Sequence, residues 1–454
     1  MTHILIKNGR IIDPSQELDA NSNLLITDGV VSKISKDIDS TDDTRVINAK
    51  GLVITPGFID IHCHLRQPGF EDKETIATGT EAAVRGGFTT VCAMPNTNPT
   101  TDTRATVDFI NRVSLETGVA RVLPIGCITK GSLGQELSEM GELAEAGVVG
   151  FSDDGHPVTN PNIMRQALSY SLSHDLPIIN HCESLELSQG GVMNEGWISN
   201  RLGLKGIPTS SEATMVSRDI ALAKLTGGRL HIAHMSTEES IEIIALAKAQ
   251  GIRVTCEVTP HHLTLSDESV LGRTGDVVPD KFDALTHAAY DTNAKVNPPL
   301  RATEDVHAMV KALKNGTVDF IATDHAPHNE VGKLCTFDEA EFGISGLETA
   351  FGSVMALVHS NKIDLSSIIE KLTCAPAKFL IESSKVLDSK LGTLQIGAPG
   401  DVTVFDPSEK WIVDSNQFAS KGKNTPLDGS TLTGKVKLTI VQGKIQYSNI
   451  KNND

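Results

Sequence analysis

The stretch GFIDIHCHLRQPG, residues 57–69, decides the fold and raises the first question about function. Apart from Asp60 it is apolar up to Ile61, places His62 and His64 two residues apart at the end of a strand-like segment, and continues into Arg66. Side chains two apart on a strand point to the same side. The two imidazoles can therefore face one site together, while Cys63 between them turns into the packing.

Seven more apolar, β-branched segments recur along the chain. Together the predicted strands are 53–65, 89–96, 120–129, 147–154, 176–183, 229–236, 252–261 and 318–327. Helix-like stretches separate most of them, such as 71–85, 104–116, 211–225 and 238–249. Buried strands alternating with amphipathic helices predict a parallel sheet, and eight such units predict an α/β fold of the (β/α)8 TIM-barrel type. A doubly wound sheet is less favoured, because no G-x-G-x-x-G fingerprint follows the first strand.

The two ends of the chain have a different pattern. Residues 1–52 alternate in polarity and contain Asn-Gly and Asp-Gly pairs, and a similar pattern returns from about Leu391. Such pairs are typical of hairpins. We expect a small β-sandwich formed by both ends, with its N-terminal half at 1–52, the metal-dependent barrel at 53–375 and its C-terminal half at 376–454. The stretch 265–300 is predicted to be a long loop with a functional or mobile role.

Composition limits the class of protein. The 454 residues are 39% hydrophobic and 21% charged, without a run of apolar residues long enough to span a membrane or an apparent signal peptide. These features predict a cytoplasmic enzyme that does not bind membranes. The net charge of −17 argues against nucleic acid as a partner. The seven cysteines form no C-x-x-C pair and are predicted to be reduced, mostly buried thiols.

Residues able to bind a metal recur where the predicted strands end. They are His62, His64, Asp153, Asp154, His181, His234 and Asp324. The carboxyl ends of barrel strands converge on one face, so these side chains predict a metal site, with zinc the default ion for imidazole and carboxylate ligands. One histidine alone would more often be structural, but the set exceeds a single tetrahedral site and indicates two metals. Periodicity does not choose between Asp153 and Asp154, which point to opposite faces.

Several longer motifs resemble one family. They are DIHCHLRQPG, GGFTTVCAMPNT, FSDDG, HCE, HIAHMST, EVTPHHL, NPPLR, ATDHAPH and FGISGLETAF, with GAPGDVTVFD beyond. In this order they resemble the cyclic amidohydrolases, and most closely the class I, bacterial-type dihydroorotases. The resemblance implies reversible interconversion of N-carbamoyl-L-aspartate and L-dihydroorotate in pyrimidine biosynthesis. It also implies a homodimer as the family expectation and a possible association with aspartate transcarbamoylase.

The resemblance also implies roles for individual residues. His62 and His64 would bind one zinc ion, His181 and His234 the other, and Asp154 would bridge them. Asp324 would be a metal ligand and the general base and acid, acting on a hydroxide that bridges the two ions. The implied substrate contacts are His64, Arg66, Asn96, Asn297, His328, Phe342 and Gly343. His156, His261, His262 and His325 are expected to pack or to lie outside the ligand set.

The sequence departs from the wider superfamily in two places. Many relatives bridge their metals with a carboxylated lysine after strand four, but GVVGFSDD contains no lysine. Extra residues before NPPLR put the placement of Asn297 in doubt, and the loop from His328 to Gly343 is a candidate lid. Two alternatives remain: an allantoinase or hydantoinase, whose substrates lack the α-carboxylate, and a non-catalytic partner of aspartate transcarbamoylase. The full set of predicted ligands counts against the second.

Overall fold

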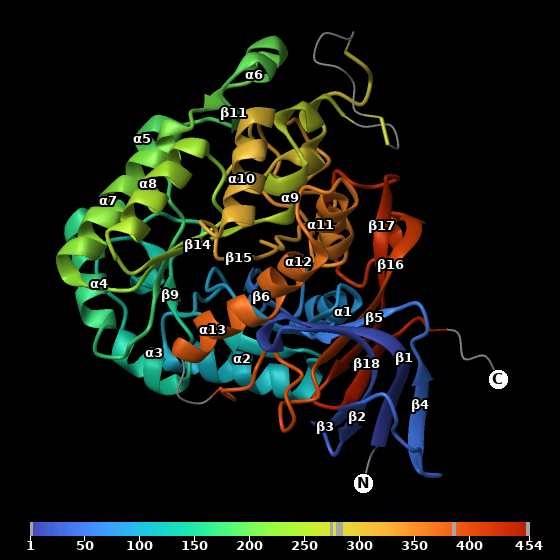
Figure 1. Ribbon diagram of the computed structural model, residues 1–454. Coiled ribbons are helices and arrows are strands. Elements are labelled where there is room, and N and C mark those ends of the chain that lie inside the picture. Colours follow the sequence, from blue (N-terminus) through green and yellow to red (C-terminus); the bar gives the residue numbers. More distant parts are fainter. Residues whose placement is uncertain (1–2, 273–275, 278–284, 384–386, 451–454) are drawn as a thin grey trace.

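Eight parallel strands form a closed barrel at the centre of the chain (Figure 1). The computed structural model describes residues 3–272, 276–277, 285–383 and 387–450. The barrel strands are β6 (Phe58–Cys63), β7 (Phe88–Ala93), β8 (Arg121–Pro124), β9 (Phe151–Ser152), β10 (Ile178–Asn180), β13 (Leu230–Ile232), β14 (Val254–Val258) and β15 (Phe320–Ile321). Parallel bridges from Gly126 to Phe151 and from Cys63 to His325 join the two sets of strands. The predicted TIM barrel is confirmed, and seven of its eight strands lie within a predicted segment, while β7 begins one residue before the predicted segment 89–96.

Helices surround the barrel (Figure 1). They are α1 (Ile76–Arg85), α2 (Arg104–Thr117), α3 (Met140–Ala146), α4 (Pro161–Ser171), α5 (Leu185–Ser188), α6 (Trp197–Leu202), α7 (Ser210–Thr226), α8 (Glu238–Ala249), α9 (Pro260–Thr264), α10 (Thr303–Asn315), α11 (Ala350–His359), α12 (Leu365–Leu372) and α13 (Cys374–Glu382). The helix predicted from residue 71 begins only at Ile76. The reason is local, because the Thr75 hydroxyl accepts from the Thr78 N–H and caps the first turn.

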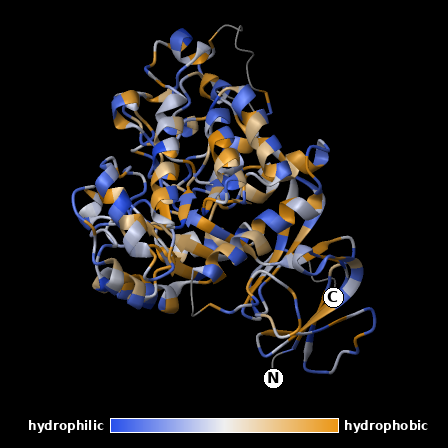
Figure 2. Cartoon of the chain, turned by 60° about the vertical axis from the view of Figure 1, so that its left-hand side comes forward, coloured by the Kyte–Doolittle hydropathy of each residue, from blue (hydrophilic) through white to orange (hydrophobic). Residues whose placement is uncertain are grey.

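The apolar residues gather on the barrel strands and on the inward faces of the helices (Figure 2). Phe58, Phe88, Phe151 and Phe320, all in barrel strands, are among the largest fully buried side chains. A core of this kind fixes the strands laterally, so that the residues following each strand are held in constant relative positions. Five of the seven cysteines are buried and free, as predicted.

Both ends of the chain combine in one eight-stranded sheet beside the barrel (Figure 1). Its strands are β1 (His3–Asp13), β2 (Leu18–Thr27), β3 (Val30–Ser35), β4 (Thr44–Asn48), β5 (Val53–Pro56), β16 (Val402–Ile412), β17 (Thr431–Val441) and β18 (Lys444–Ser448). The sheet has its own apolar core, which includes Ile6, Ile54, Val404 and Leu438. The predicted pairing of the two ends is thus present, as one continuous hydrogen-bonded sheet. The domain boundaries at 52/53 and 375/376 stay a prediction.

The predicted first barrel strand, 53–65, is divided in two. Its first part, β5, pairs with β1 and β16 in the terminal sheet, and only β6 enters the barrel. Gly57 lies between them. A Cβ atom at this position would lie 2.2 Å from the Thr89 Oγ1, so the position requires glycine. The chain therefore passes from one sheet to the other at a point where a side chain would not fit.

The long stretch 265–300 is only partly a loop. It contains 3-10 turns at Asp267–Leu271 and Thr292–Ala294. Residues 273–275 and 278–284 of the predicted loop lie outside the described residues. A further short strand pair, β11 (Met193–Asn194) with β12 (Gly206–Ile207), lies near α6. Among the described helices, none is long and apolar enough to cross a membrane.

Candidate metal centre and substrate cavity

Six predicted metal ligands lie together at the carboxyl ends of the barrel strands. They are His62, His64, Asp154, His181, His234 and Asp324, each between 0 and 4% exposed. Two groups have ligand atoms within 4.8 Å of one another: His62, His64 and Asp154, and Asp154, His181 and His234. Burying this many charged and polar groups in one place is costly unless they bind something between them.

Asp154 is common to both groups. Its Oδ2 lies 3.5 Å from the Nε2 atoms of His62 and His64, and its Oδ1 lies 3.3 Å from the Nε2 of His234 and 3.6 Å from the Nδ1 of His181. Asp153 faces away, where its carboxylate accepts from the backbone N–H groups of Ile128 and Thr129. The geometry thus separates two neighbouring aspartates that periodicity could not distinguish.

The backbone bends sharply at three of these strand ends. Arg66, His234 and Asp324 have φ angles of 60°, 32° and 46°. Residues other than glycine seldom adopt this left-handed region, and each instance costs about 1–3 kcal/mol unless the surroundings compensate. Such conformations cluster at functional sites.

In three of the histidines, the ring nitrogen that faces away from the cluster is hydrogen-bonded to another side chain. The Nδ1 of His62 lies 2.6 Å from the Glu257 Oε1, and the Nδ1 of His64 lies 2.8 Å from the Asn96 Oδ1. The Nε2 of His181 lies 3.0 Å from the Glu183 Oε2. Each contact directs the other ring nitrogen toward the cluster, as in the carboxylate–histidine–metal arrangement. No role was predicted for Glu257 or Glu183, although each is a lone charge in or after an apolar strand.

The carboxylates of the cluster favour the ionised state. Burial disfavours the charge on Asp324, but the hydrogen bond from His64 and the charge of His62 outweigh it and lower its pKa. For Asp154 the charge of His62 and the hydrogen bonds from His181 and His234 likewise outweigh burial and lower the pKa. The pKa of Glu257 falls to about 2 despite burial, because His62 and His231 stabilise its charge. Ionised oxygens and imidazole nitrogens are the donor set that zinc prefers.

All seven predicted substrate contacts border one cavity of about 440 Å³ next to the cluster. These residues are His64, Arg66, Asn96, Asn297, His328, Phe342 and Gly343. Asp154, His181 and Asp324 border the same cavity, which therefore opens directly onto the metal-binding groups. Its remaining wall includes Lys73 and Glu341, which form an ion pair at 3.2 Å.

Arg66 and Asn96 border the cavity and retain hydrogen-bond donors that a substrate could use. The Nε of Arg66 donates to the Pro327 carbonyl, and its Nη2 lies 3.3 Å from the Nε2 of His328. The Asn96 oxygen is used by His64, which leaves the two amide hydrogens of Asn96 free to donate. The guanidinium fork and the amide together match the geometry of a carboxylate.

His328 is placed to hold the protein backbone. Its Nε2 lies 2.8 Å from the Phe342 carbonyl oxygen, which only accepts, so this nitrogen carries the proton. Burial and the nearby charge of Arg66 lower the pKa of His328 to about 2, which keeps the ring neutral. The Nδ1 then has a lone pair and no donor for a carboxylate. His328 borders the cavity, and its contact with the substrate carboxylate stays a prediction.

Asn297 and Gly343 are already hydrogen-bonded. The Asn297 amide donates to the Glu183 Oε2 at 2.9 Å, which leaves its Oδ1 as an acceptor. The Gly343 N–H donates to the Lys295 carbonyl, and its own carbonyl accepts from the Asn424 amide. A substrate N–H could still reach the second lone pair of the Gly343 or Phe342 carbonyl oxygen. The extra residues before Asn297 do not displace it from the cavity.

The other conspicuous histidines lie outside the two metal-binding groups, as expected. The Nε2 of His262 donates to the Pro298 carbonyl, and His325 is buried, with its Nε2 3.4 Å from Glu74. His156 is exposed on the rim of the cavity. His261 is buried, and its Nε2 has no hydrogen-bond partner among the described residues.

Solved structures with the same fold include a hydantoinase and a dihydropyrimidinase. The L-hydantoinase (dihydropyrimidinase) from Arthrobacter aurescens matches 99% of this chain and 97% of its own, with a TM-score of 0.84 and 23% identity. The dihydropyrimidinase from Brevibacillus agri matches with a TM-score of 0.81 and 20% identity over 99% of this chain and 95% of its own. The barrel and the terminal sheet thus have the fold of these solved structures.

Closer relatives narrow the class to one family. A family model described as dihydro-orotase-like matches residues 51–240. A dihydroorotase from Geobacter sp. (strain M21) is 46% identical over 98% of this chain and 99% of its own length. A dihydroorotase from Caldanaerobacter subterraneus is 47% identical over 99% of this chain and 98% of its own length. This chain belongs to the dihydroorotase family.

Proposed function

We propose that the chain is a dihydroorotase, which interconverts N-carbamoyl-L-aspartate and L-dihydroorotate. The observation that carries the proposal is the single cavity in which a carboxylate-binding pair, Arg66 and Asn96, faces the histidine–aspartate cluster. Family membership at 46–47% identity over nearly the whole length supports the same activity. The substrate is thus a small dianionic or monoanionic molecule that enters at the carboxyl end of the barrel.

We propose that the cluster binds two zinc ions. The Nε2 of His62 is buried and lacks a hydrogen-bond partner among the described residues, although it points toward Asp154 and Asp324, each 3.5 Å away. We assign one ion to His62, His64 and Asp324, the other to His181 and His234, with Asp154 shared. When bound, the ions would act as Lewis acids on the amide carbonyl and lower the pKa of a water molecule.

Arg66 and Asn96 would bind the substrate carboxylate, and the two donors would fix the ring in the cavity. Asn297 would accept from a ring N–H through its Oδ1, because its amide group is used by Glu183. The Phe342 and Gly343 carbonyl oxygens would contact a second N–H. Holding the ring at both ends would place the amide carbonyl against the metal-binding groups.

Asp324 would move the proton. It borders the cavity, is ionised, and lies 3.1 Å from the Nε2 of His64. In hydrolysis it would accept the proton of the attacking water and return it to the leaving ring nitrogen. In the reverse direction it would take the proton from the carbamoyl nitrogen. One carboxylate thus serves as base and then acid.

An allantoinase or hydantoinase activity is the second candidate, because solved hydantoinases share the fold. Two features disfavour it. Allantoin and hydantoin lack the carboxylate that Arg66 and Asn96 would bind, and GVVGFSDD has no lysine to bridge the metals. The candidate of a non-catalytic partner is disfavoured by the complete, buried ligand set. We further propose a cytoplasmic homodimer that associates with aspartate transcarbamoylase in some settings.

Dihydroorotate hydrolysis during zinc titration tests the proposal. The protein would be stripped with chelator and titrated with Zn²⁺ while turnover of dihydroorotate, allantoin and hydantoin is followed. We expect activity on dihydroorotate that saturates near two equivalents. Saturation at one equivalent would remove the second ion, and greater activity on allantoin or hydantoin would overturn the substrate assignment.

A further inference from the structure

A line of buried polar side chains crosses the barrel from the metal-binding cluster to the opposite face. The Nδ1 of His62 lies 2.6 Å from the Glu257 Oε1, and the other oxygen of Glu257 lies 3.2 Å from the Nε2 of His231. The Nδ1 of His231 lies 2.8 Å from the Thr255 Oγ1. His62, Glu257 and His231 are all 0% exposed. Barrel interiors are normally filled by apolar branched side chains, so this line is unusual.

The hydrogen bonds in this line run in a fixed direction. Glu257 accepts from three groups, His62, His231 and the backbone N–H of His234 at 3.3 Å, as an ionised carboxylate does. His231 then carries a proton on Nε2, and in the neutral ring its Nδ1 accepts from the Thr255 hydroxyl. His62 must carry its proton on Nδ1. In the neutral ring, which is the form that binds a metal ion, its Nε2 has a lone pair that points into the cluster.

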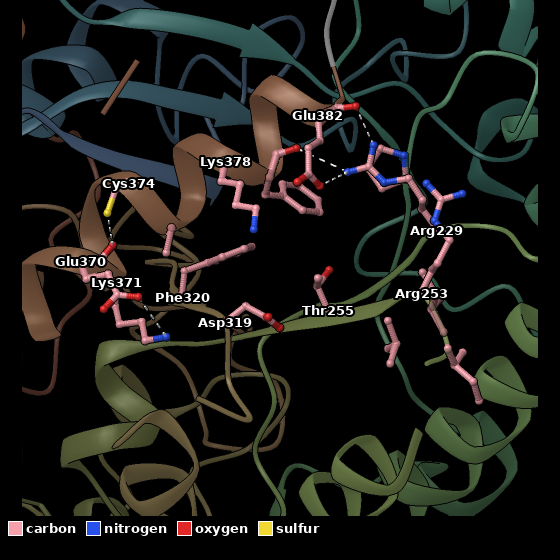
Figure 3. A pocket seen from close by; sticks show the side chains of 16 residues that line it. Arg229, Arg253, Thr255, Asp319, Phe320, Glu370, Lys371, Cys374, Lys378 and Glu382 are labelled. Carbon is pink, nitrogen blue, oxygen red and sulfur yellow. Dashed lines mark hydrogen bonds and ion pairs between the residues drawn. The ribbon is translucent and has the colours of Figure 1, made fainter. Parts of the chain in front are cut away.

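Packing holds the central imidazole of the line in place. The His231 ring stacks on Phe320 at a centroid distance of 5.2 Å and an interplanar angle of 13°, and Phe379 covers it at 4.9 Å. The line ends at Thr255, in the wall of a cavity of about 570 Å³ at the amino end of the strands (Figure 3). Both carboxylate oxygens of Glu257 are therefore hydrogen-bonded, one to His62 and the other to the His231 ring, which the two phenylalanines hold in place.

We propose that His231 and Thr255 are positioning residues of the metal centre, which act through Glu257 to fix the orientation and the tautomer of His62. The inference rests on the proposed metal site. Without the His231 N–H, one oxygen of Glu257 lacks its donor and the carboxylate is free to turn away from His62. Loss of groups that orient metal ligands typically weakens metal binding about 10–100-fold. Because His231 acts one contact further from the metal, we expect about 10-fold.

The test is zinc affinity of the full-length protein, measured by competition with a chromophoric chelator. His231→Phe keeps a flat ring between Phe320 and Phe379 but has no donor, whereas His231→Gln offers an amide N–H to Glu257. Thr255→Val removes the last hydroxyl with little change in volume, and Thr255→Ser restores it. Thr439→Val is the matched control, because the buried Thr439 hydroxyl bonds the Val84 carbonyl at 2.6 Å in the terminal sheet.

We expect His231→Phe to bind one of two zinc ions about 10-fold more weakly, with partial recovery in His231→Gln. Thr255→Val should show a smaller loss that Thr255→Ser reverses, and Thr439→Val should bind zinc as the wild type does. The visible spectrum of the Co²⁺-substituted protein should change in His231→Phe and not in the control.

Unchanged zinc affinity in both His231→Phe and Thr255→Val would overturn the inference, even if both unfold at lower temperature. If His231→Phe does not fold, the Thr255 pair decides alone. Wild-type protein that binds no zinc would instead overturn the proposed metal centre, and the inference with it. Failure of the inference and failure of the proposed metal centre therefore give different results.

Discussion

Asp153 and Asp154 are neighbours in the chain, but their carboxylates lie on opposite sides of the strand end. Asp153 accepts from the backbone N–H groups of Ile128 and Thr129 at 2.8 and 3.0 Å. Asp154 lies within 3.3–3.6 Å of four histidine nitrogens. One aspartate therefore holds the loop after β8, and the other is available to bridge two metal ions.

This division predicts different results for two matched substitutions. Asp154→Asn keeps the size of the side chain but removes the charge that both metal positions share, so we expect bound zinc to fall from two per chain to one or none. Asp153→Asn should retain two, because its carboxylate contacts the backbone N–H groups of Ile128 and Thr129 and the Thr129 hydroxyl, and none of the metal-binding groups. Zinc content after dialysis measures both. Loss of zinc in Asp153→Asn with retention in Asp154→Asn would reverse the assignment.

Arg66 should control affinity for the substrate carboxylate. Arg66→Ala removes a charged hydrogen-bonding group, worth about 1.5–3 kcal/mol, or roughly a 10–100-fold rise in KM for dihydroorotate. Dihydrouracil, which is the same ring without the carboxylate, is the control substrate. Its kcat/KM should hardly change between wild type and variant. An equal loss with both substrates would indicate that Arg66 supports the barrel rim instead.

Asp324 should be needed for proton transfer rather than for folding. Asp324→Asn keeps the shape of the side chain but has no basic oxygen, so we expect kcat to fall by at least about 100-fold. The thermal unfolding midpoint of the metal-free protein should stay close to that of the wild type. Turnover near the wild-type rate would remove Asp324 from the proton-transfer role.

The sequence predicted which side chains lie together in the cluster, because those residues obey two simple rules. A strand alternates its faces, which pairs His62 with His64, and parallel strands end on one face, which gathers His181, His234 and Asp324 around them. Both rules need only the chain order. The fold was predictable from chain order as well, because mostly apolar strand segments alternate with helical patterns.

Contacts between strands distant in sequence could not be predicted in this way. Glu257 is hydrogen-bonded to His62, which lies 195 residues away in the sequence. His328 is hydrogen-bonded to the Phe342 carbonyl, whose position depends on the loop between these two residues. A usable signal was present at Glu257, because it is the one charged residue in the strand VTCEV. A charge inside an apolar barrel strand requires a buried partner. The start of α1 was missed because the Thr75 cap is a local contact that hydrophobic periodicity does not report.

Lys333 ties two loops beside the cavity together. Its side chain is buried and donates to the carbonyl oxygens of Thr292, Lys295 and Glu341 at 3.0, 3.1 and 2.6 Å. Lys295 in turn lies 4.4 Å from the centre of the Phe342 ring. The loop from His328 to Gly343 is thereby fixed to the segment before Asn297, and both border the cavity.

Lys333 should make the stability of the protein depend on pH. Burial and the charge of Lys295 lower its pKa to about 7, whereas an unfolded lysine titrates near 10.4. Between these values the unfolded chain binds the additional proton, so the free energy of unfolding rises as pH increases from about 7 toward 10.4.

Lys333→Met keeps the stem of the side chain and removes this titration. The advantage of the wild type over the variant should therefore grow between pH 6.5 and 9, measured as the midpoint of urea unfolding. Lys224→Met, which removes an exposed lysine on α7, is the control and should run parallel to the wild type. Parallel curves for Lys333→Met as well would show that the buried amine keeps an ordinary pKa and that its three carbonyl bonds are those of a permanently charged group.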